Sequence, residues 1–257
     1  MIKLGSSSIS KAYFGANEIT KAYLGSTEVY SSASSYGTLV DAWIARATAL
    51  SYTIPAAGTL SVLQTQLANI GDTTLAKMDV LHIYSPDAGT MDFFTINAVA
   101  PTTFQATLVS APTTSVNGIL TDGSSYIDTG ASPSSLSEYA LEDAQMSVYF
   151  SQDLADGGSI NYPAGVINSA TSSLLMAPSP SVAGGRDYSS VNNAFFRADS
   201  STNMSAALKT IQRVNSSQVS MYSDGVLVDT VAQSSTVLAN GGVYLGGINR
   251  DGTFDEG

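Results

Sequence analysis

The chain has 257 residues, no cysteine, a net charge of −11, and only 12% charged residues. The lack of cysteine excludes disulfide bonds and thiolate metal sites. Binding to phosphate groups needs clustered Lys and Arg, which this acidic chain lacks, so neither nucleic acid nor an anionic membrane is expected as a partner.

The N-terminus has no basic region followed by an apolar one, as a secretory signal peptide would have. No apolar run reaches the roughly eighteen residues of a membrane-spanning helix. We therefore expect a soluble protein without an N-terminal export signal.

Residues 1–30 repeat every ten positions, with Gly5, Gly15 and Gly25 in register. Because side chains alternate along a strand, an even period lets every copy present the same face. Each unit offers about six strand residues, such as 19–24, followed by a glycine-led polar turn. We predict a short β-meander.

Such a meander is marginal by itself in water, so it must dock on a partner. Its apolar positions fall on both faces, and a strand that is apolar on both faces is expected to be covered on both. We therefore predict that residues 1–30 anchor the chain in an assembly. The anchoring positions are Leu4, Ile9, Tyr13, Phe14, Ile19, Tyr23, Leu24 and Val29.

Helical periodicity follows a Ser/Gly-rich linker at 31–37. The spacing predicts a helix over about 38–50, with a capping box at Thr38 and Trp43 in the core. A second helix is expected from a cap at Thr59 to a stop at Gly71, and a third segment, helical at first, runs from residue 75 to Pro86. These pieces define a small helical module at 38–90.

From residue 91 onward the period changes to two, and turn clusters recur about every ten residues. This pattern predicts a mainly β fold, an antiparallel two-sheet sandwich spanning 91–257. In the clearest hairpin, Asp224-Gly225 supplies the two positive φ angles of a tight turn. The expected strands are 91–97, 103–110, 124–130, 144–151, 173–178, 193–198, 210–215, 218–223, 226–232 and 243–248.

The hairpin V-S-M-Y-S-D-G-V-L-V at 219–228, followed by V-Y-L-G-G-I-N at 243–249, resembles the late strands of laminin-G-like, or concanavalin-like, lectin sandwiches. Residues 117–130 are similar to an early strand of those domains. The decapeptides resemble the N-terminal K-x-Y-L-G-S-T-E tracts of bacteriophage virion structural proteins, where a short helical segment joins such repeats to a laminin-G-like domain. The resemblance implies a jelly-roll sandwich in a virion protein made in the host bacterial cytoplasm.

The sequence departs from that pattern at its end. Laminin-G-like domains continue with a further strand that closes a sheet, and the present sequence stops at Phe254-Asp255-Glu256-Gly257, where that strand should begin. Either the sequence is part of a longer protein or a neighbouring chain completes the sheet.

Catalytic patterns are weak, and we expect no enzyme. His82 is the only histidine, and its apolar surroundings indicate a satisfied core or boundary residue. Glycoside hydrolysis needs two carboxylates flanking a sugar, and some related sandwiches carry them as E-x-D-x-x-E. Glu138, Glu142 and Asp143 lack that spacing.

Two kinds of binding site remain open from the sequence. No cofactor is expected except a calcium ion, for which the candidate loops hold Asp251 with Asp255 and Asp153 with Asp156. Tyr and Asn in loops at one rim of the sandwich are candidates for glycan contact. These glycan candidates are Tyr162, Tyr188, Asn192 and Asn193.

Three functions follow from these features. The first is an adhesive virion protein, part of a tail, tail fibre, head fibre or capsid decoration, that binds a host-surface carbohydrate. The second is an assembly component without glycan binding, and the third is a polysaccharide depolymerase. Expected partners are other virion proteins through residues 1–30 and copies of the chain itself, as a homotrimer, because open strand edges invite pairing.

Overall fold

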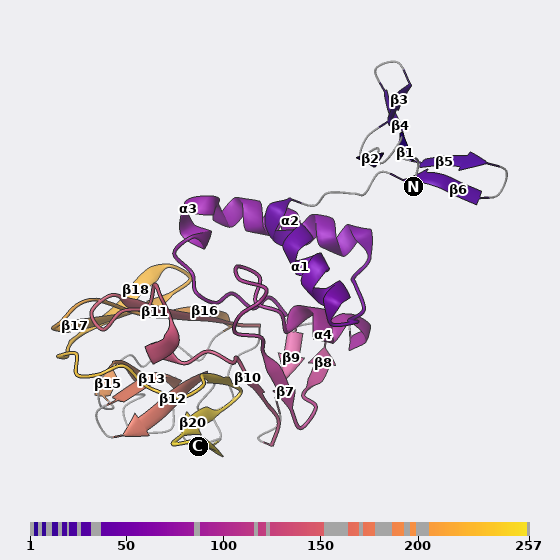
Figure 1. Cartoon of the computed structure of the whole chain (residues 1–257). Helices are drawn as coiled ribbons and strands as arrows, with labels where there is room; N and C mark the ends of the chain where they lie inside the picture. Colours follow the sequence, from indigo (N-terminus) through magenta and orange to yellow (C-terminus); the bar gives the residue numbers. More distant parts are fainter. Residues whose placement is uncertain are drawn as a thin grey trace.

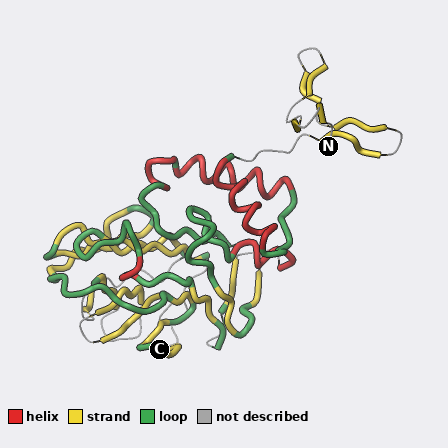
Figure 2. Tube along the Cα trace, in the orientation of Figure 1, coloured by secondary structure: helices red, strands yellow, loops and turns green. Residues whose placement is uncertain are grey.

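The computed structural model describes residues 3–4, 7–8, 12–14, 17–19, 21–24, 27–31, 37–84, 88–115, 118–121, 124–151, 164–169, 172–177, 187–192, 196–198 and 206–255. Strands dominate these residues, and a few helices accompany them (Figures 1 and 2). The protein is therefore mainly β, as its period-two pattern predicts.

The decapeptide repeats form three separate hairpins. In each hairpin the strands flank a two-residue gap led by glycine, because Leu4 pairs with Ser7, Phe14 with Asn17 and Leu24 with Thr27. The paired strands are β1 (Lys3–Leu4) and β2 (Ser7–Ser8), β3 (Ala12–Phe14) and β4 (Asn17–Ile19), and β5 (Lys21–Leu24) and β6 (Thr27–Ser31).

We expected a polar turn of about four residues, such as 25–28, after each strand. In the structure the paired strands are separated by two residues, and Thr27 and Glu28 belong to β6. A two-residue loop lets polar residues such as Thr27 join a strand directly after the turn. The anchoring side chains lie outside the described part of the structure, as does the linker at 32–36. Anchoring through residues 1–30 therefore stays a prediction.

The two long helices were predicted correctly, but their caps were not. Gly37 caps α1, whose Asp41 amide donates to the Gly37 carbonyl, and Ala56 caps α2, so neither Thr38 nor Thr59 is a cap. Gly71 ends α2 with a φ of 84°, as predicted. The helices are α1 (Thr38–Ala49), α2 (Ala57–Ile70), α3 (Asp72–Leu75), α4 (Met91–Phe94) and the 3-10 turns η1 (Ala88–Thr90) and η2 (Pro133–Ser135).

Two segments differ from their expected form. The third helical segment is only the four-residue α3, which ends at Leu75, where we expected a helix to begin. Residues 91–94, expected as a strand, form α4 because the helical core takes up both Phe93 and Phe94. A strand would have turned these two neighbours to opposite faces.

Trp43 is the centre of the helical core and is fully buried, as predicted. Its indole nitrogen donates to the Phe93 carbonyl over 2.8 Å, and its ring stacks on that of Phe93 at 4.7 Å. Ile96, Ala98 and Val99 belong to the same cluster. The apolar core of the helical part therefore continues past residue 90, the boundary expected from the sequence.

Most of the remaining described strands belong to a nine-stranded sheet, in the order β15-β14-β13-β12-β19-β10-β7, with β20 and β21 joined at β12. Among the strand pairs that the structure describes, β12 and β20 alone are parallel. Its strands are β7 (Thr107–Val109), β10 (Tyr126–Asp128), β12 (Ala164–Ser169), β13 (Ser172–Ala177), β14 (Asp187–Val191), β15 (Phe196–Ala198), β19 (Tyr244–Leu245), β20 (Ile248–Arg250) and β21 (Thr253–Asp255); β8 (Thr113–Ser115) and β9 (Gly118–Leu120) form a separate hairpin.

A second, four-stranded sheet has the order β11-β16-β17-β18. It contains β11 (Ala144–Phe150), β16 (Ala207–Asn215), β17 (Gln218–Ser223) and β18 (Val226–Ala232). Asp224 and Gly225 have φ angles of 48° and 77°, so the predicted tight turn between β17 and β18 is confirmed.

The two sheets share one apolar core, and Figure 1 shows them as two layers. Val166, Leu174 and Val191 enter it from the nine-stranded sheet, and Ile211 and Val219 from the four-stranded one. Every second side chain of β11 and β16 faces this core. The alternate side chains consequently point away from it, on the far side of the four-stranded sheet.

Asp79 links the helical part to the β part. Its carboxylate accepts hydrogen bonds from the Ser137 hydroxyl and from the backbone amides of Ser137, Glu138 and Tyr139, at 2.7 to 3.0 Å. Burial alone would raise the pKa of Asp79, but these donors together hold it below its usual value. The ionised carboxylate therefore fastens the 137–139 loop.

Candidate ligand-binding face

The four-stranded sheet presents a face turned away from the core, which we call the outer face. Strand alternation assigns to it the residues opposite those of the core. The outer face consists of Gln145, Ser147 and Tyr149 of β11, Leu208, Thr210, Gln212 and Val214 of β16, Gln218, Ser220 and Tyr222 of β17, and Leu227 and Thr230 of β18. None of these side chains is charged, although the chain as a whole carries −11.

Hydroxyl and amide groups on the outer face are ordered by contacts between neighbouring strands. The Gln145 amide donates to the Ser147 hydroxyl at 3.0 Å, and that hydroxyl pairs with the Thr210 hydroxyl at 2.8 Å. On the other half, the Ser220 hydroxyl lies 3.4 Å from that of Thr230. A hydroxyl both donates and accepts, so the exposed Ser147 and Thr230 keep further hydrogen-bonding capacity for a ligand, whereas Ser220 is buried.

Gln212 lies at the centre of the outer face, between Gln145 and Ser220 in the strand register. Within the described part of the chain, its side-chain amide makes no hydrogen bond. A free primary amide offers two donors and an acceptor at one point. Such a group suits a ligand that carries neighbouring hydroxyls.

Apolar and aromatic side chains gather at one end of the outer face, near the β17–β18 turn. Tyr149 has an exposed fraction of 68% and lies beside Leu208 in the register, while Tyr222 lies beside the exposed Leu227. Two tyrosines and two leucines thus flank the polar centre. An aromatic ring that presents its apolar surface and its hydroxyl to solvent can cover one side of a ligand and also hydrogen-bond to it.

Of the four residues predicted to contact a glycan, the structure describes the side chain of Asn192 alone. Asn192 is fully buried, so that prediction is wrong. Its side-chain amide donates to the carbonyls of Ala140 and Leu141, and its side-chain oxygen accepts from the Tyr139 hydroxyl. Asn192 thereby holds the 139–141 loop against the sheet. Tyr188 belongs to β14, with an undescribed side chain, and Tyr162 and Asn193 lie outside the described residues.

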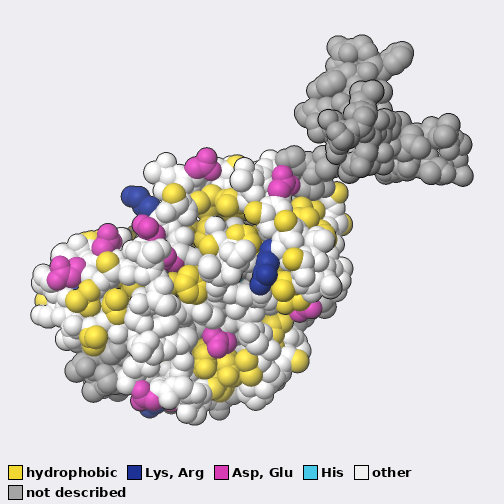
Figure 3. All heavy atoms as spheres, viewed as in Figure 1, with side chains coloured by type: hydrophobic (Ala, Val, Ile, Leu, Met, Phe, Trp, Pro, Cys, Tyr) yellow, Lys and Arg dark blue, Asp and Glu magenta, His cyan; other side chains and the backbone are white. Residues whose placement is uncertain are grey.

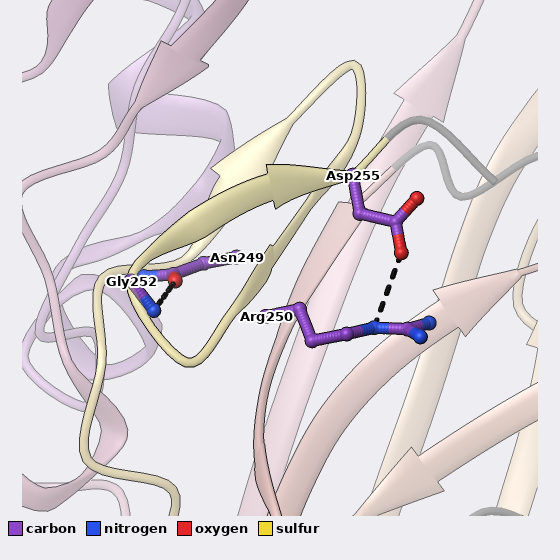
Figure 4. A network of polar contacts seen from close by, with 4 residues as sticks. All are labelled: Asn249, Arg250, Gly252 and Asp255. Atoms are coloured by element: carbon purple, nitrogen blue, oxygen red, sulfur yellow. Dashed lines mark hydrogen bonds and ion pairs between the residues drawn. The ribbon is translucent and has the colours of Figure 1, made fainter.

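The calcium candidates Asp251 and Asp255 belong to the β20–β21 hairpin (Figure 4). The Asp255 carboxylate pairs with the Arg250 guanidinium at 3.1 Å, and the Asn249 side-chain oxygen accepts from the Gly252 amide. Asp251 lies in the turn, with a φ of 49°. Arg250 thus supplies positive charge to one candidate carboxylate, and the loop of Asp153 and Asp156 lies outside the described residues.

His82 has a different environment from the satisfied one that we expected. Both ring nitrogens are buried and lack a hydrogen-bond partner among the described residues, and the ring stacks on Tyr84. Burial lowers its pKa to about 4, although backbone groups of Thr129, Ile96 and Phe104 favour the charged form. At neutral pH the imidazole is therefore uncharged. The described part of the chain contains no cluster of three His, Asp or Glu side chains that could hold a metal.

An aromatic cluster fixes the end of the nine-stranded sheet. Tyr126 stacks on Phe254 at a ring distance of 4.4 Å and lies 4.5 Å from the Tyr244 ring. Burial, together with Tyr126 and Asp128, raises the pKa of Tyr244 to about 12. Gly247 lies so close to the Phe254 ring that a Cβ atom would overlap it. We interpret this cluster as structural.

Comparison with known proteins gave no match to a family model, a curated protein or a solved structure. Of the helices that the structure describes, none combines the length and apolarity needed to cross a bilayer. Charged side chains are sparse over the face of the molecule shown in Figure 3.

Sequence reasoning placed the glycan contacts in loops and missed the outer face. The signal was nonetheless present. The strands expected at 144–151, 210–215 and 218–223 alternate apolar residues with Gln, Ser and Thr. Arg213 is the only charged residue in these three segments, and Lys209 directly precedes the second. Both of these cations are buried on the core side. Alternation alone thus predicts an uncharged second face.

Proposed function

We propose that this protein is a bacteriophage virion structural protein that adheres to a carbohydrate of the host surface. In this proposal residues 1–30 anchor it to the particle, the helices act as a neck, and a laminin-G-like jelly-roll sandwich carries the ligand-binding outer face. It acts as a binding protein and not as an enzyme.

The virion part of the proposal rests on the order of the parts. Ten-residue repeats with a K-x-Y-L-G pattern precede a short helical part and then two sheets that share a core. Each repeat forms a hairpin of two short strands, which is marginal in water without a partner. Docking on other virion proteins would supply that partner.

The uncharged outer face is the observation that carries the adhesive role. Sugars present hydroxyl groups for hydrogen bonding and apolar ring faces for contact with aromatic side chains. The outer face pairs a centre of hydroxyls and amides with the exposed Tyr149 and the half-buried Tyr222, which matches both features. Charged side chains, which would retain bound water and select for ionic partners, are missing from it.

Substituting Gln212 or Tyr149 with alanine is expected to weaken binding to the recognised glycan about tenfold each. The first change removes hydrogen bonds and the second an aromatic contact, each worth about 1 kcal/mol. A glycan array identifies the ligand, and titration calorimetry then compares the variants. Val62→Ala, at an exposed position of α2, is the matched control and should leave affinity unchanged.

Two results would contradict the adhesive role. One is a wild-type protein that binds no glycan at high concentration. The other is a glycan bound equally well by all three variants. The first result would favour a pure assembly component, for which the exposed Leu208 and Leu227 would serve as protein contacts.

Deleting residues 1–30 is expected to leave a folded protein that no longer joins the particle. The described members of the helical and β cores all lie between residues 39 and 245, so circular dichroism should be nearly unchanged. Incorporation is measured by complementing a phage that lacks the gene. Normal incorporation of the shortened protein would refute anchoring by the repeats.

A further inference from the structure

The four-stranded sheet has two edges, β11 and β18, with opposite properties. An unpaired edge exposes backbone N–H and C=O groups that can pair with another chain. Soluble proteins commonly prevent such pairing with charges, prolines, bulges or covering elements. In the part of the chain that the structure describes, one of the two edges has such protection and the other does not.

The β18 edge is protected in three ways. A bulge interrupts its pairing with β17, because Met221 pairs with Asp229 and Tyr222 with Leu227, leaving Val228 unpaired. Asp229 lies opposite the core residue Met221 and so places a charge on the inner side of this edge. β18 also contacts β15 of the other sheet.

Among the described residues, the β11 edge has none of these three features. Its seven residues pair with β16 in an unbroken register and include no charged residue and no proline. Within the described part of the chain, no strand pairs with its other side. Met146, Val148 and Phe150 pack on the shared core but stay only partly buried. Partly exposed apolar side chains and unpaired backbone groups are therefore both available at this edge for pairing with another chain.

We infer that two copies of this chain pair through β11 in antiparallel orientation, with Ser147 opposite the partner's Ser147. This register uses all seven residues of the strand. It sets Met146 beside the partner's Val148 and Gln145 beside the partner's Tyr149, and it opposes no charges. The exposed sides of the partly buried Met146, Val148 and Phe150 become covered by the same residues of the other copy.

The pairing joins two four-stranded sheets into one sheet of eight strands. The two outer faces become continuous, and each copy contributes Tyr149 next to the amide cluster of the other. A ligand that spans both faces would gain from the second site without any new type of contact. The dimer rests on the edge geometry alone and is independent of glycan binding. It predicts a two-fold assembly in place of the homotrimer expected from the sequence.

A single introduced cysteine tests the register, because the 257-residue sequence contains no other cysteine. Opposed residues in an antiparallel pair have Cα atoms about 4.5–5.5 Å apart, within the range that a disulfide spans. Ser147→Cys should therefore form a covalent dimer under mild oxidation. Thr230→Cys, at an exposed position of the protected edge, is the matched control and should stay uncrosslinked.

A charge at the same two positions tests the interaction without a covalent bond. By light scattering after size exclusion, the wild type and Thr230→Lys should have twice the 26.6 kDa chain mass. Ser147→Lys should be monomeric, because two like charges would face each other across the pair. Circular dichroism checks that each variant is folded. A monomeric wild type, or a trimer in which Ser147→Cys does not crosslink, would overturn the inference.

Discussion

Replacing Arg213 with alanine is expected to lower the free energy of unfolding by about 3–5 kcal/mol, because it leaves buried carbonyls without their donor and creates a cavity. Arg213 is fully buried among the core residues of β16. Its guanidinium donates to the carbonyls of Val191, Gln233 and Asn215 at 3.0, 2.7 and 3.3 Å. It thereby ties β14, the end of β16 and the segment after β18 to one another.

The charge itself is not the source of this stabilisation. Burial lowers the pKa of Arg213, an effect partly offset by Tyr139 and Glu142. The alanine variant leaves several buried carbonyls without a donor and also creates a cavity. Arg213→Met fills the cavity without restoring the donors, so we expect a loss of about 1–3 kcal/mol.

Urea denaturation followed by far-ultraviolet circular dichroism measures both variants. The expected order of stability is wild type, then the methionine variant, then the alanine variant. Val214→Ala, at the neighbouring exposed position, is the control for a change on the same strand and should cost little. An alanine variant within about 1 kcal/mol of the wild type would show that Arg213 does not hold these segments together.

Acidification from about pH 7 to about pH 5 is expected to lower the free energy of unfolding by about 2 kcal/mol through His82. The folded chain holds this imidazole neutral, with a pKa of about 4, whereas the unfolded chain protonates it near 6.5. Between these two values the unfolded state binds the extra proton. Stability therefore falls as pH decreases through this window and is fully recovered above it.

Because His82 is the only histidine, a single substitution tests this effect. The chain with His82→Phe should have the same stability at the two pH values, apart from small contributions of other groups. Asp79 acts in a lower window: its pKa is depressed, so its contribution is present above about pH 4 and is lost as pH falls further. An acid loss above pH 5 that persists in the phenylalanine variant would contradict the role of His82.

The alternation of apolar and polar residues was sufficient to predict most strands of the four-stranded sheet. β11, β16, β17 and β18 all fall on expected segments, and the turn at Asp224-Gly225 was read from two residues. These elements can be predicted from the sequence because both the period of a strand and the residues of a turn involve neighbours in the chain. Segments with mixed signals, such as Phe93 and Phe94, were assigned by the core that they join.

The functional residues divide in the same way. The uncharged character of the outer face is written in the sequence, because it follows from which residues alternate with core residues. The burial of Asn192 against the 139–141 loop depends on residues about fifty positions away in the chain, and the burial of His82 without a hydrogen-bond partner among the described residues depends on how the surrounding segments pack. No local pattern could have indicated either environment.

The sequence by itself determined the ten-residue repeats, the two long helices, the mainly β character of the remainder and the scarcity of charge. Only the tertiary structure decided which strands are edges, since strand order arises from long-range pairing. It thereby distinguished the protected β18 from the open β11. Local chemistry sets the form of each element, whereas the choice of neighbours depends on how the whole chain buries its apolar surface.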